Sequence, residues 1–150
     1  MDRDGLVKKI TEIQDEGITS LDLSGAELGT LHADVTDLEW LTELNLRSNE
    51  LSTLPAEIGN LRNLRRLNLS GNRLEMLPPE IGNLTNLRRL NIGGNQLQAL
   101  PPEIGNLTAL TWVFSPSNQL QELPDTIGSL TNLAEFQLSG NQIVVLPPTF

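Results

Sequence analysis

Apolar and polar residues follow a fixed pattern along most of the chain. The stretch L-x-x-L-x-L/I begins at Leu41, Leu64 and Leu87, and its alternation predicts a short strand with one buried face. In each copy an asparagine, a turn, the sequence L-x-x-L-P and a second apolar set follow. Proline and glycine in this second half predict an irregular segment, or a short helical or 3₁₀ turn, because neither suits a long helix.

The pattern repeats every 23 residues without insertion or deletion. Residues 64–86 read LRRLNLSGNRLEMLPPEIGNLTN, and residues 87–109 read LRRLNIGGNQLQALPPEIGNLTA. A fixed period of this length predicts stacked units and no single central core. We expect six parallel strands about 4.8 Å apart, near residues 20–24, 43–47, 66–70, 89–93, 112–116 and 135–139. The units start at Ile18, Leu41, Leu64, Leu87, Leu110 and Leu133, and the last unit is incomplete.

An asparagine recurs where each expected strand turns. A buried turn leaves backbone groups that need partners, and an amide side chain offers both a donor and an acceptor. We therefore expect a structural asparagine ladder that bridges adjacent turns. Ala26 takes this position in the first unit, and the ladder consists of Asn49, Asn72, Asn95, Asn118 and Asn141.

The blocks L-x-x-L-x-L-x-x-N/A-x-L/I-x-x-L in six successive units resemble the leucine-rich repeat family, and the likeness extends over residues 18–150. The 23-residue length and halves such as LPPEIGNL at 77–84 are similar to the intracellular Ras-suppressor-like class. The resemblance implies an α/β solenoid, a horseshoe with a parallel concave sheet and an irregular or 3₁₀ convex side. It also implies a non-catalytic module that binds a protein or peptide on the concave face.

A second function follows from the order of the segments. A helical segment followed by repeats is similar to the start of bacterial Roco-type signalling GTPases. The alternative is therefore a structural or self-associating N-terminal repeat domain of such a protein. No phosphate-binding sequence GxxxxGK[ST] occurs in the chain, so a GTPase domain would have to lie beyond residue 150.

The two ends of the chain carry different predictions. Residues 1–17 predict a capping helix over 4–16, with Asp4 as its N-cap and Gly17 as its stop. Its apolar residues Leu6, Ile10 and Ile13 share one face that would cover the first unit. The other end stops at LPPTF inside the sixth unit, without the polar cap that solenoids need. Either the sequence is a fragment of a longer protein, or this end self-associates.

Composition and charge exclude several classes of function. With 19 acidic and 10 basic residues the net charge is −9, which argues against nucleic acid and an anionic membrane surface as partners. No cysteine is present, which excludes disulfides and thiolate chemistry, and a cytoplasmic location is expected. The sole histidine, His32, has Asp34 and Asp37 near it in sequence, and we interpret it as a solvated residue. We expect no enzyme, no metal and no cofactor.

Arginine and aromatic residues gather at positions expected on the concave face. One row of outward positions includes Arg66, Arg89 and Trp112, and the next includes Phe114. Arginine beside exposed aromatic rings is typical of an interface hot spot, so we expect a partner with acidic groups beside an apolar anchor. The alternative is that the arginines are solvated copies of one duplicated unit. The candidate partner-binding residues are Arg47, Arg65, Arg66, Arg88, Arg89, Trp112 and Phe114.

The stretch TWVFSPSNQ at 111–119 departs from the other units. Repeat spacing predicts that Val113 and Ser115 point inward while Trp112 and Phe114 point outward. Ser115 then replaces a core leucine, which costs burial, and Pro116 cannot donate to a ladder. The alternative is a one-residue flip that buries an aromatic ring and exposes Ser115.

Overall fold

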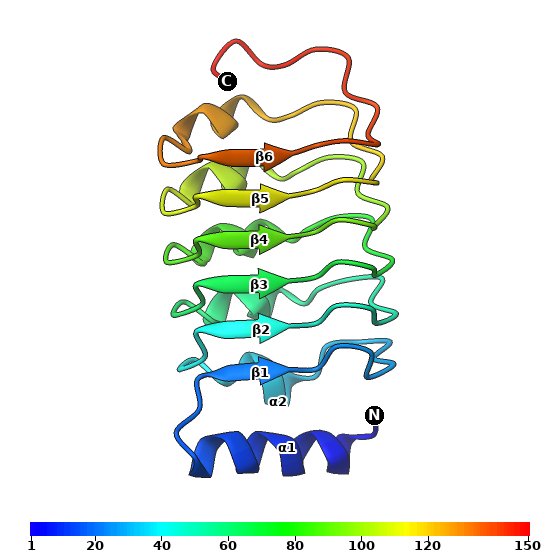
Figure 1. Cartoon of the computed structure of the whole chain (residues 1–150), viewed down its shortest axis with the longest axis vertical. Helices are drawn as coiled ribbons and strands as arrows, with labels where there is room; N and C mark the ends of the chain where they lie inside the picture. Colours follow the sequence, from blue (N-terminus) through cyan, green and yellow to red (C-terminus); the bar gives the residue numbers. More distant parts are fainter.

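One sheet of six parallel strands runs the length of the protein in a computed structural model that describes residues 1–150 (Figure 1). Each residue pairs with the one 23 positions later, as Leu21 does with Leu44 and Leu44 with Leu67. The predicted parallel solenoid is therefore confirmed. The strands follow chain order: β1 (Ser20–Asp22), β2 (Glu43–Asn45), β3 (Arg66–Asn68), β4 (Arg89–Asn91), β5 (Trp112–Phe114) and β6 (Glu135–Gln137).

The strands are three residues long, two shorter at their C-terminal ends than expected. Hydrogen bonds continue past the regular pairing, since Leu23 N donates to Asn45 O at 2.8 Å and Gly25 N donates to Arg47 O at 2.9 Å. Gly25 has a φ of +63°, a left-handed conformation that turns the chain away from the sheet. The left-handed glycine therefore ends the strand, although backbone hydrogen bonds to the next unit continue beyond it.

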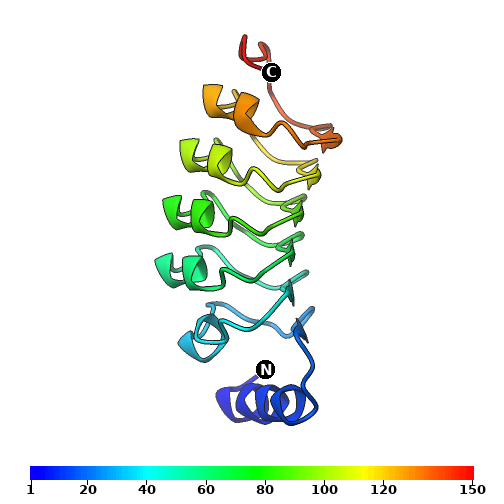
Figure 2. The same cartoon turned by 90° about the vertical axis from the view of Figure 1, so that its left-hand side faces the viewer.

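Short helical turns form the convex side opposite the sheet (Figure 2). The first unit has a four-residue α-helix, α2 (Ala33–Thr36), and later units have 3₁₀ turns. A Cβ atom on Gly82 would lie only 2.7 Å from the carbonyl oxygen of Glu103. Glycine is therefore required for adjacent turns to approach this closely. The 3₁₀ turns are η1 (Ala56–Asn60), η2 (Pro79–Asn83), η3 (Pro102–Asn106) and η4 (Asp125–Ser129).

The N-terminal helix α1 spans Arg3–Asp15, one residue earlier than expected. Its N-cap is Asp2, whose Oδ1 accepts from Gly5 N at 2.9 Å, so the prediction that Asp4 is the cap was wrong. Both aspartates suit a cap, and Asp4 lies in the first turn, where its charge complements the helix dipole. Of the predicted apolar face, Leu6 and Ile10 are buried against the first unit and Ile13 is only partly buried.

Helix α1 ends at Asp15, one residue before the predicted end, and Gly17 provides the predicted stop. Gly17 has a φ of +66°, and its N–H donates to Gln14 O at 3.1 Å. Ile18 N donates to Ile13 O at 2.8 Å. These two bonds form a Schellman motif, which ends a helix at a left-handed glycine.

Two rows of apolar side chains fill the space between the sheet and the convex turns. One row contains Leu44, Leu67 and Leu90, and the other contains Leu46, Leu69 and Ile92. All six are no more than 2% exposed. In the sixth unit the corresponding Phe136 and Leu138 are only partly buried, because no further unit packs on them.

Each asparagine at the turn connects its own unit to the preceding one. Nδ2 of Asn72 donates to Leu46 O at 3.0 Å and to Leu69 O at 2.9 Å, and its Oδ1 accepts from Leu51 N at 3.1 Å. Asn49 makes the equivalent bond to Leu23 O. The first unit has no preceding unit to bridge, which explains why Ala26 can occupy its position.

Candidate partner-binding groove

A groove on the concave face crosses β1 to β5 and encloses about 320 Å³. Its floor consists of outward-facing strand residues, which alternate with the buried leucines. Charged, amide and aromatic side chains therefore share one surface. We call it the concave groove, and it is lined by Ser20, Asp22, Glu43, Leu44, Asn45, Arg66, Leu67, Asn68, Arg89, Asn91 and Trp112.

Strand β5 has the register in which Trp112 and Phe114 face outward. Val113 and Ser115 are 1% and 0% exposed, whereas Trp112 and Phe114 are half-buried on the concave side. The prediction from repeat spacing is confirmed, and the flipped register is wrong. The two rings stack with centroids 5.4 Å apart and planes inclined by 5°. They form an aromatic wall at the C-terminal end of the concave groove.

Pro116 does not remove an inter-strand hydrogen bond in this register. Ser115 N donates to Gln137 O at 2.9 Å, and Ser117 N donates to Ser139 O at 2.8 Å. The proline lies between these donors, at the position whose backbone nitrogen points away from the next strand. Its own carbonyl accepts from Gly94 N at 2.9 Å, so the β5 contacts with both neighbours persist.

Two of the four charges that line the concave groove neutralise each other. Arg66 Nη1 lies 3.3 Å from Glu43 Oε1, and both side chains are about half exposed. Arg89, one strand further along, forms no ion pair in the structure. Asp22 at the other end also forms none. Its Oδ1 accepts from Ser24 N at 2.8 Å, and this backbone hydrogen bond is the main reason that the pKa of Asp22 is lowered.

A row of asparagine amides runs between these charges. Oδ1 of Asn45, Asn68 and Asn91 each accepts from the backbone N–H two residues later, at 3.0–3.1 Å. This local turn holds each amide oxygen against its own chain. The Nδ2 groups of Asn68 and Asn91 form no hydrogen bond within the protein, so they remain donors for a bound molecule.

The candidate binding residues divide into two sets. Arg66, Arg89 and Trp112 line the concave groove, and Phe114 packs against Trp112. Arg65 and Arg88 are exposed one residue before β3 and β4, and Arg47 is exposed two residues after β2. These three flank the groove without lining it.

Several lining residues were absent from the candidate set. Asp22, Glu43, Asn45, Asn68 and Asn91 all occupy outward positions of the predicted strands. Their position was available from the period, but nothing in residue type singled them out. For Asn45, Asn68 and Asn91, a signal was available in the recurrence of asparagine at the last residue of β2, β3 and β4.

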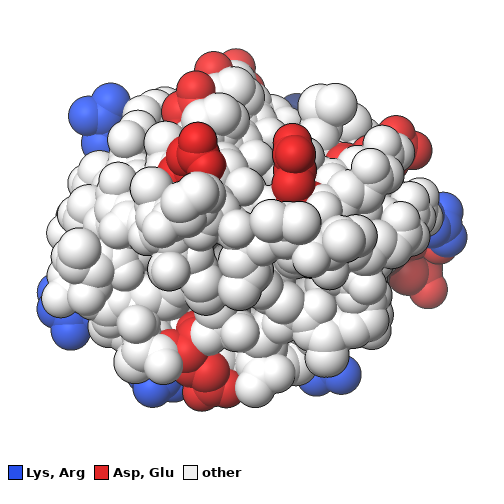
Figure 3. Space-filling model, turned by 90° about the horizontal axis from the view of Figure 1, so that it is seen from above, with Lys and Arg blue, Asp and Glu red and all other residues white.

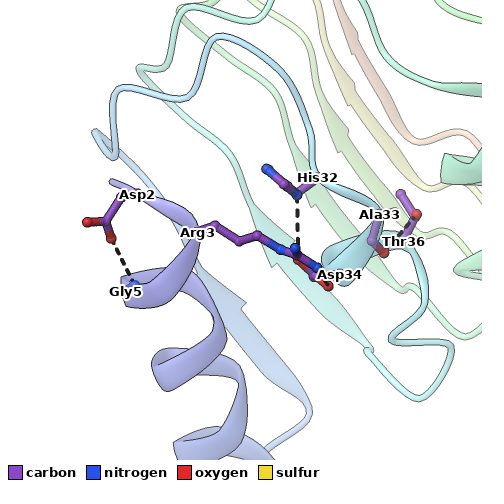
Figure 4. Close-up of polar contacts among 7 residues, drawn as sticks. All are labelled: Asp2, Arg3, Gly5, His32, Ala33, Asp34 and Thr36. Carbon is purple, nitrogen blue, oxygen red and sulfur yellow. Dashed lines mark hydrogen bonds and ion pairs between the residues drawn. The ribbon is translucent and has the colours of Figure 1, made fainter.

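A second polar cluster joins the N-terminal helix to the first unit (Figure 4). Arg3 Nε donates to Asp34 Oδ2 at 2.9 Å, and Nη2 donates to Oδ1 at 3.3 Å. His32 Nδ1 lies 3.5 Å from Asp34 Oδ2. The hydrogen bond from Arg3 is the largest cause that lowers the pKa of Asp34. No cluster of three or more histidine, cysteine, aspartate or glutamate residues has the arrangement that a metal ion needs.

The C-terminal end exposes apolar side chains. Figure 3 looks down on this end and shows a surface on which few residues are charged. Val144 and Val145 are 90% and 72% exposed, and Leu146 and Phe150 are about half exposed. The helices of the protein are too short or too polar for any of them to span a bilayer.

Comparison with known proteins identifies the repeat. A family model described as a leucine-rich repeat region matches residues 19–115. A leucine-rich repeat protein of Leptospira interrogans has a TM-score of 0.83 and 33% identity over 93% of this chain. The leucine-rich repeat ectodomain of the membrane receptor kinase GASSHO1/SCHENGEN3 from Arabidopsis thaliana, solved with Casparian strip integrity factor 2, has a TM-score of 0.76 and 36% identity over 88%.

This chain spans 42% of the length of the Leptospira structure and 17% of the length of the plant structure. No curated protein matches it. Leucine-rich repeat regions are typical of protein–protein interaction modules.

Proposed function

Because this chain belongs to the leucine-rich repeat family, we propose that it is a non-catalytic binding module whose concave groove holds a protein or peptide partner. Arg89 carries the proposal together with the aromatic wall. Its guanidinium has no carboxylate partner, and Trp112 stands directly opposite it on the next strand. A forked donor beside a half-exposed ring suits a carboxylate next to an apolar side chain.

Further support comes from the plant neighbour, which was solved in complex with Casparian strip integrity factor 2. A similar solenoid therefore holds another molecule. The amide donors of Asn68 and Asn91 favour a partner rich in hydrogen-bond acceptors, such as the backbone carbonyls of an extended chain. Arg47, Arg65 and Arg88 would contribute long-range attraction around this contact.

A pull-down from the source cell tests the module. The bait is the native protein, the triple variant Arg66→Ala/Arg89→Ala/Trp112→Ala, and Arg73→Ala as a matched control outside the concave groove. A partner retained by the native and control baits, and lost by the triple variant, supports the function. Trp112→Ala alone should weaken binding more than Arg47→Ala, by about 2 kcal/mol for a central anchor. A partner that binds all baits equally would contradict the proposal.

A second candidate function is self-association through the C-terminal end. Its support is the exposure of Val144, Val145, Leu146 and Phe150 on a face with few charges. Sedimentation over a range of concentrations measures the association. A fused polar cap should abolish it, and a monomer at high concentration without any gain from the cap contradicts it.

We also propose a finer classification. The unbroken 23-residue register and the 3₁₀ turns that follow four of the five Leu-Pro pairs support the intracellular Ras-suppressor-like class. Helix α1 before the repeats supports a place at the start of a Roco-type signalling protein, and a division into residues 1–17 and 18–150. The gene sequence downstream of codon 150 tests this directly, because a Roco-type protein requires a GxxxxGK[ST] sequence there.

A further inference from the structure

The concave groove has one unpaired charge of each sign. Of its four charged residues, Glu43 and Arg66 form an ion pair at 3.3 Å. Asp22 on β1 and Arg89 on β4 are left without an ion-pair partner. An acidic position therefore stands at one end and a basic position near the other, separated by a neutral middle.

The spacing of the strands sets the separation of these charges. Asp22 and Arg89 lie three strands apart in the sheet, which corresponds to ~14 Å at ~4.8 Å per strand. Asp22 aligns with Asn91, two residues after Arg89, so the two residues are also offset by ~7 Å along the strands and their backbones lie ~16 Å apart. An extended peptide advances ~3.4 Å per residue and points successive side chains to opposite faces. Two side chains on its same face that are four residues apart span ~14 Å, and six residues span ~20 Å. Four residues is therefore the same-face spacing nearest to this separation, and the long side chain of Arg89 covers the remainder.

The aromatic wall adds a third position. Trp112 pairs with Arg89 in the register of β4 and β5, so it lies ~4.8 Å further along the groove. The next peptide side chain on the same face stands two residues beyond the one at Arg89, ~7 Å away. An apolar side chain there would pack on the exposed side of Trp112.

We propose that the concave groove selects an extended peptide segment with a basic and an acidic side chain four residues apart, and an apolar side chain two residues beyond the acidic one. The basic group pairs with Asp22, the acidic group pairs with Arg89, and the apolar group packs on Trp112. The spacing is the same for either direction of the peptide chain. This inference rests on the proposed function, because it specifies the occupant of the same groove.

The middle of the groove fits the same occupant. Nδ2 of Asn68 and of Asn91 can donate to peptide carbonyls between the two charges. The Glu43–Arg66 ion pair offers no net charge there, so the intervening peptide positions need no charge of their own. A uniformly acidic segment fits less well, because it would bring a like charge against Asp22.

A display library of random 12-residue peptides is the probe for this specificity. It is selected on the full native chain and on Trp112→Ala. Peptides enriched only on the native protein should share the pattern basic-x-x-x-acidic-x-apolar, or its reverse. Synthetic copies of the best peptide then give dissociation constants by fluorescence polarisation.

Two conservative variants test each charge separately. Asp22→Asn keeps the acceptor for Ser24 N, since asparagine makes this bond in the next three units. Replacing the peptide's basic residue with glutamine should weaken binding about threefold on the native protein and leave it unchanged on Asp22→Asn. Replacing the peptide's acidic residue with glutamine should likewise weaken binding to the native protein and leave binding to Arg89→Gln unchanged. Arg73→Gln, outside the groove, should preserve both effects.

The outcomes separate this inference from the proposed function. Enriched peptides that need Trp112 but lack the charge pattern, or whose charges do not couple to Asp22 and Arg89, overturn the inference and leave the binding module intact. Failure to enrich any peptide on the native protein above the Trp112→Ala background overturns both. The predicted pattern with both couplings supports both.

Discussion

Asn118 Nδ2 donates to the side-chain oxygen of Ser115 at 3.4 Å. In the other units the equivalent amide donates to the backbone carbonyl of the core residue at that position, as Asn95 does to Ile92 O at 3.0 Å. The carbonyl of Ser115 still accepts from Asn141 Nδ2 at 2.7 Å, as Ile92 O accepts from Asn118 Nδ2 at 2.9 Å. The hydroxyl therefore replaces one ladder bond, at the repeat position that Ile92 and Leu138 occupy in the neighbouring units.

Replacing Ser115 with valine should stabilise the fold. Ser115 is 0% exposed, and an apolar side chain there adds burial between Ile92 and Leu138 that a hydroxyl cannot supply. We expect a gain of about 1 kcal/mol in the free energy of unfolding, measured by urea denaturation. A loss of stability would mean that the bond to Asn118 outweighs the added packing.

Ser48 and Ser117 should each be improved by glycine. Their φ values are both 54°, at the repeat position where Gly25, Gly71 and Gly94 have φ of 63–67°. A residue with a side chain destabilises the folded protein by roughly 1 kcal/mol in this left-handed conformation. Glycine removes this strain, but it offsets part of the gain because it also increases the conformational entropy of the unfolded chain. Ser48→Gly and Ser117→Gly should each raise the unfolding free energy by about 0.5 kcal/mol. The matched control Ser139→Gly, at a position without positive φ, should lower it.

Truncation of the aromatic wall should affect stability only modestly. Trp112 and Phe114 are half-buried, so Trp112→Ala and Phe114→Ala lose mainly their mutual stacking, about 1 kcal/mol each. Leu90→Ala, at a position that is 0% exposed, should cost about 2–5 kcal/mol. Thermal melts compare the three. A loss from Trp112→Ala as large as that from Leu90→Ala would make the ring a core residue and remove it from the proposed hot spot.

Acid should weaken the attachment of α1. The pKa of Asp34 is lowered, first by the hydrogen bond from Arg3, so the folded-state pKa lies below the unfolded value of about 3.9. The contact therefore stabilises the folded protein above this pH, and its contribution disappears as the pH falls through the folded-state pKa. Asp34→Asn should be less stable than the native protein at pH 7, and the difference should shrink at pH 3. Asp37→Asn is the control, because Asp37 lies in the same segment and forms no ion pair. Its difference in stability from the native protein should not shrink between pH 7 and pH 3.

Deletion of residues 1–17 should expose the first unit. Leu6 and Ile10 are 1% and 8% exposed against it, and their loss leaves apolar surface in contact with water. The truncated protein should melt at a lower temperature and scatter more light at high concentration. Equal melting temperatures and equal scattering would show that the helix does not act as a cap.

Periodicity made the backbone of this protein predictable, since a single register determines strand order, core rows and the outward face of β5. Helix boundaries were less predictable, because Asp2 and Asp4 are both suitable N-caps and residue type alone does not decide between them. The ion pair of Glu43 with Arg66 depends on side-chain rotamers across two strands. Sequence could therefore place Arg66 and Arg89 on one face, but it could not show that only Arg89 is unpaired.

The constant register also has a consequence for folding kinetics. Every strand pairing closes a loop of the same length, because each residue meets the one 23 positions later. Adding a unit therefore lengthens the chain without lengthening any loop, so the average sequence separation of contacts falls relative to chain length. Folding can then start in any well-packed unit and extend to its neighbours one at a time. In such an array a slow step is traced to a single weak unit. Ser115 buries a small polar side chain where the preceding units bury leucine or isoleucine, so extension from β4 to β6 should pause at this unit.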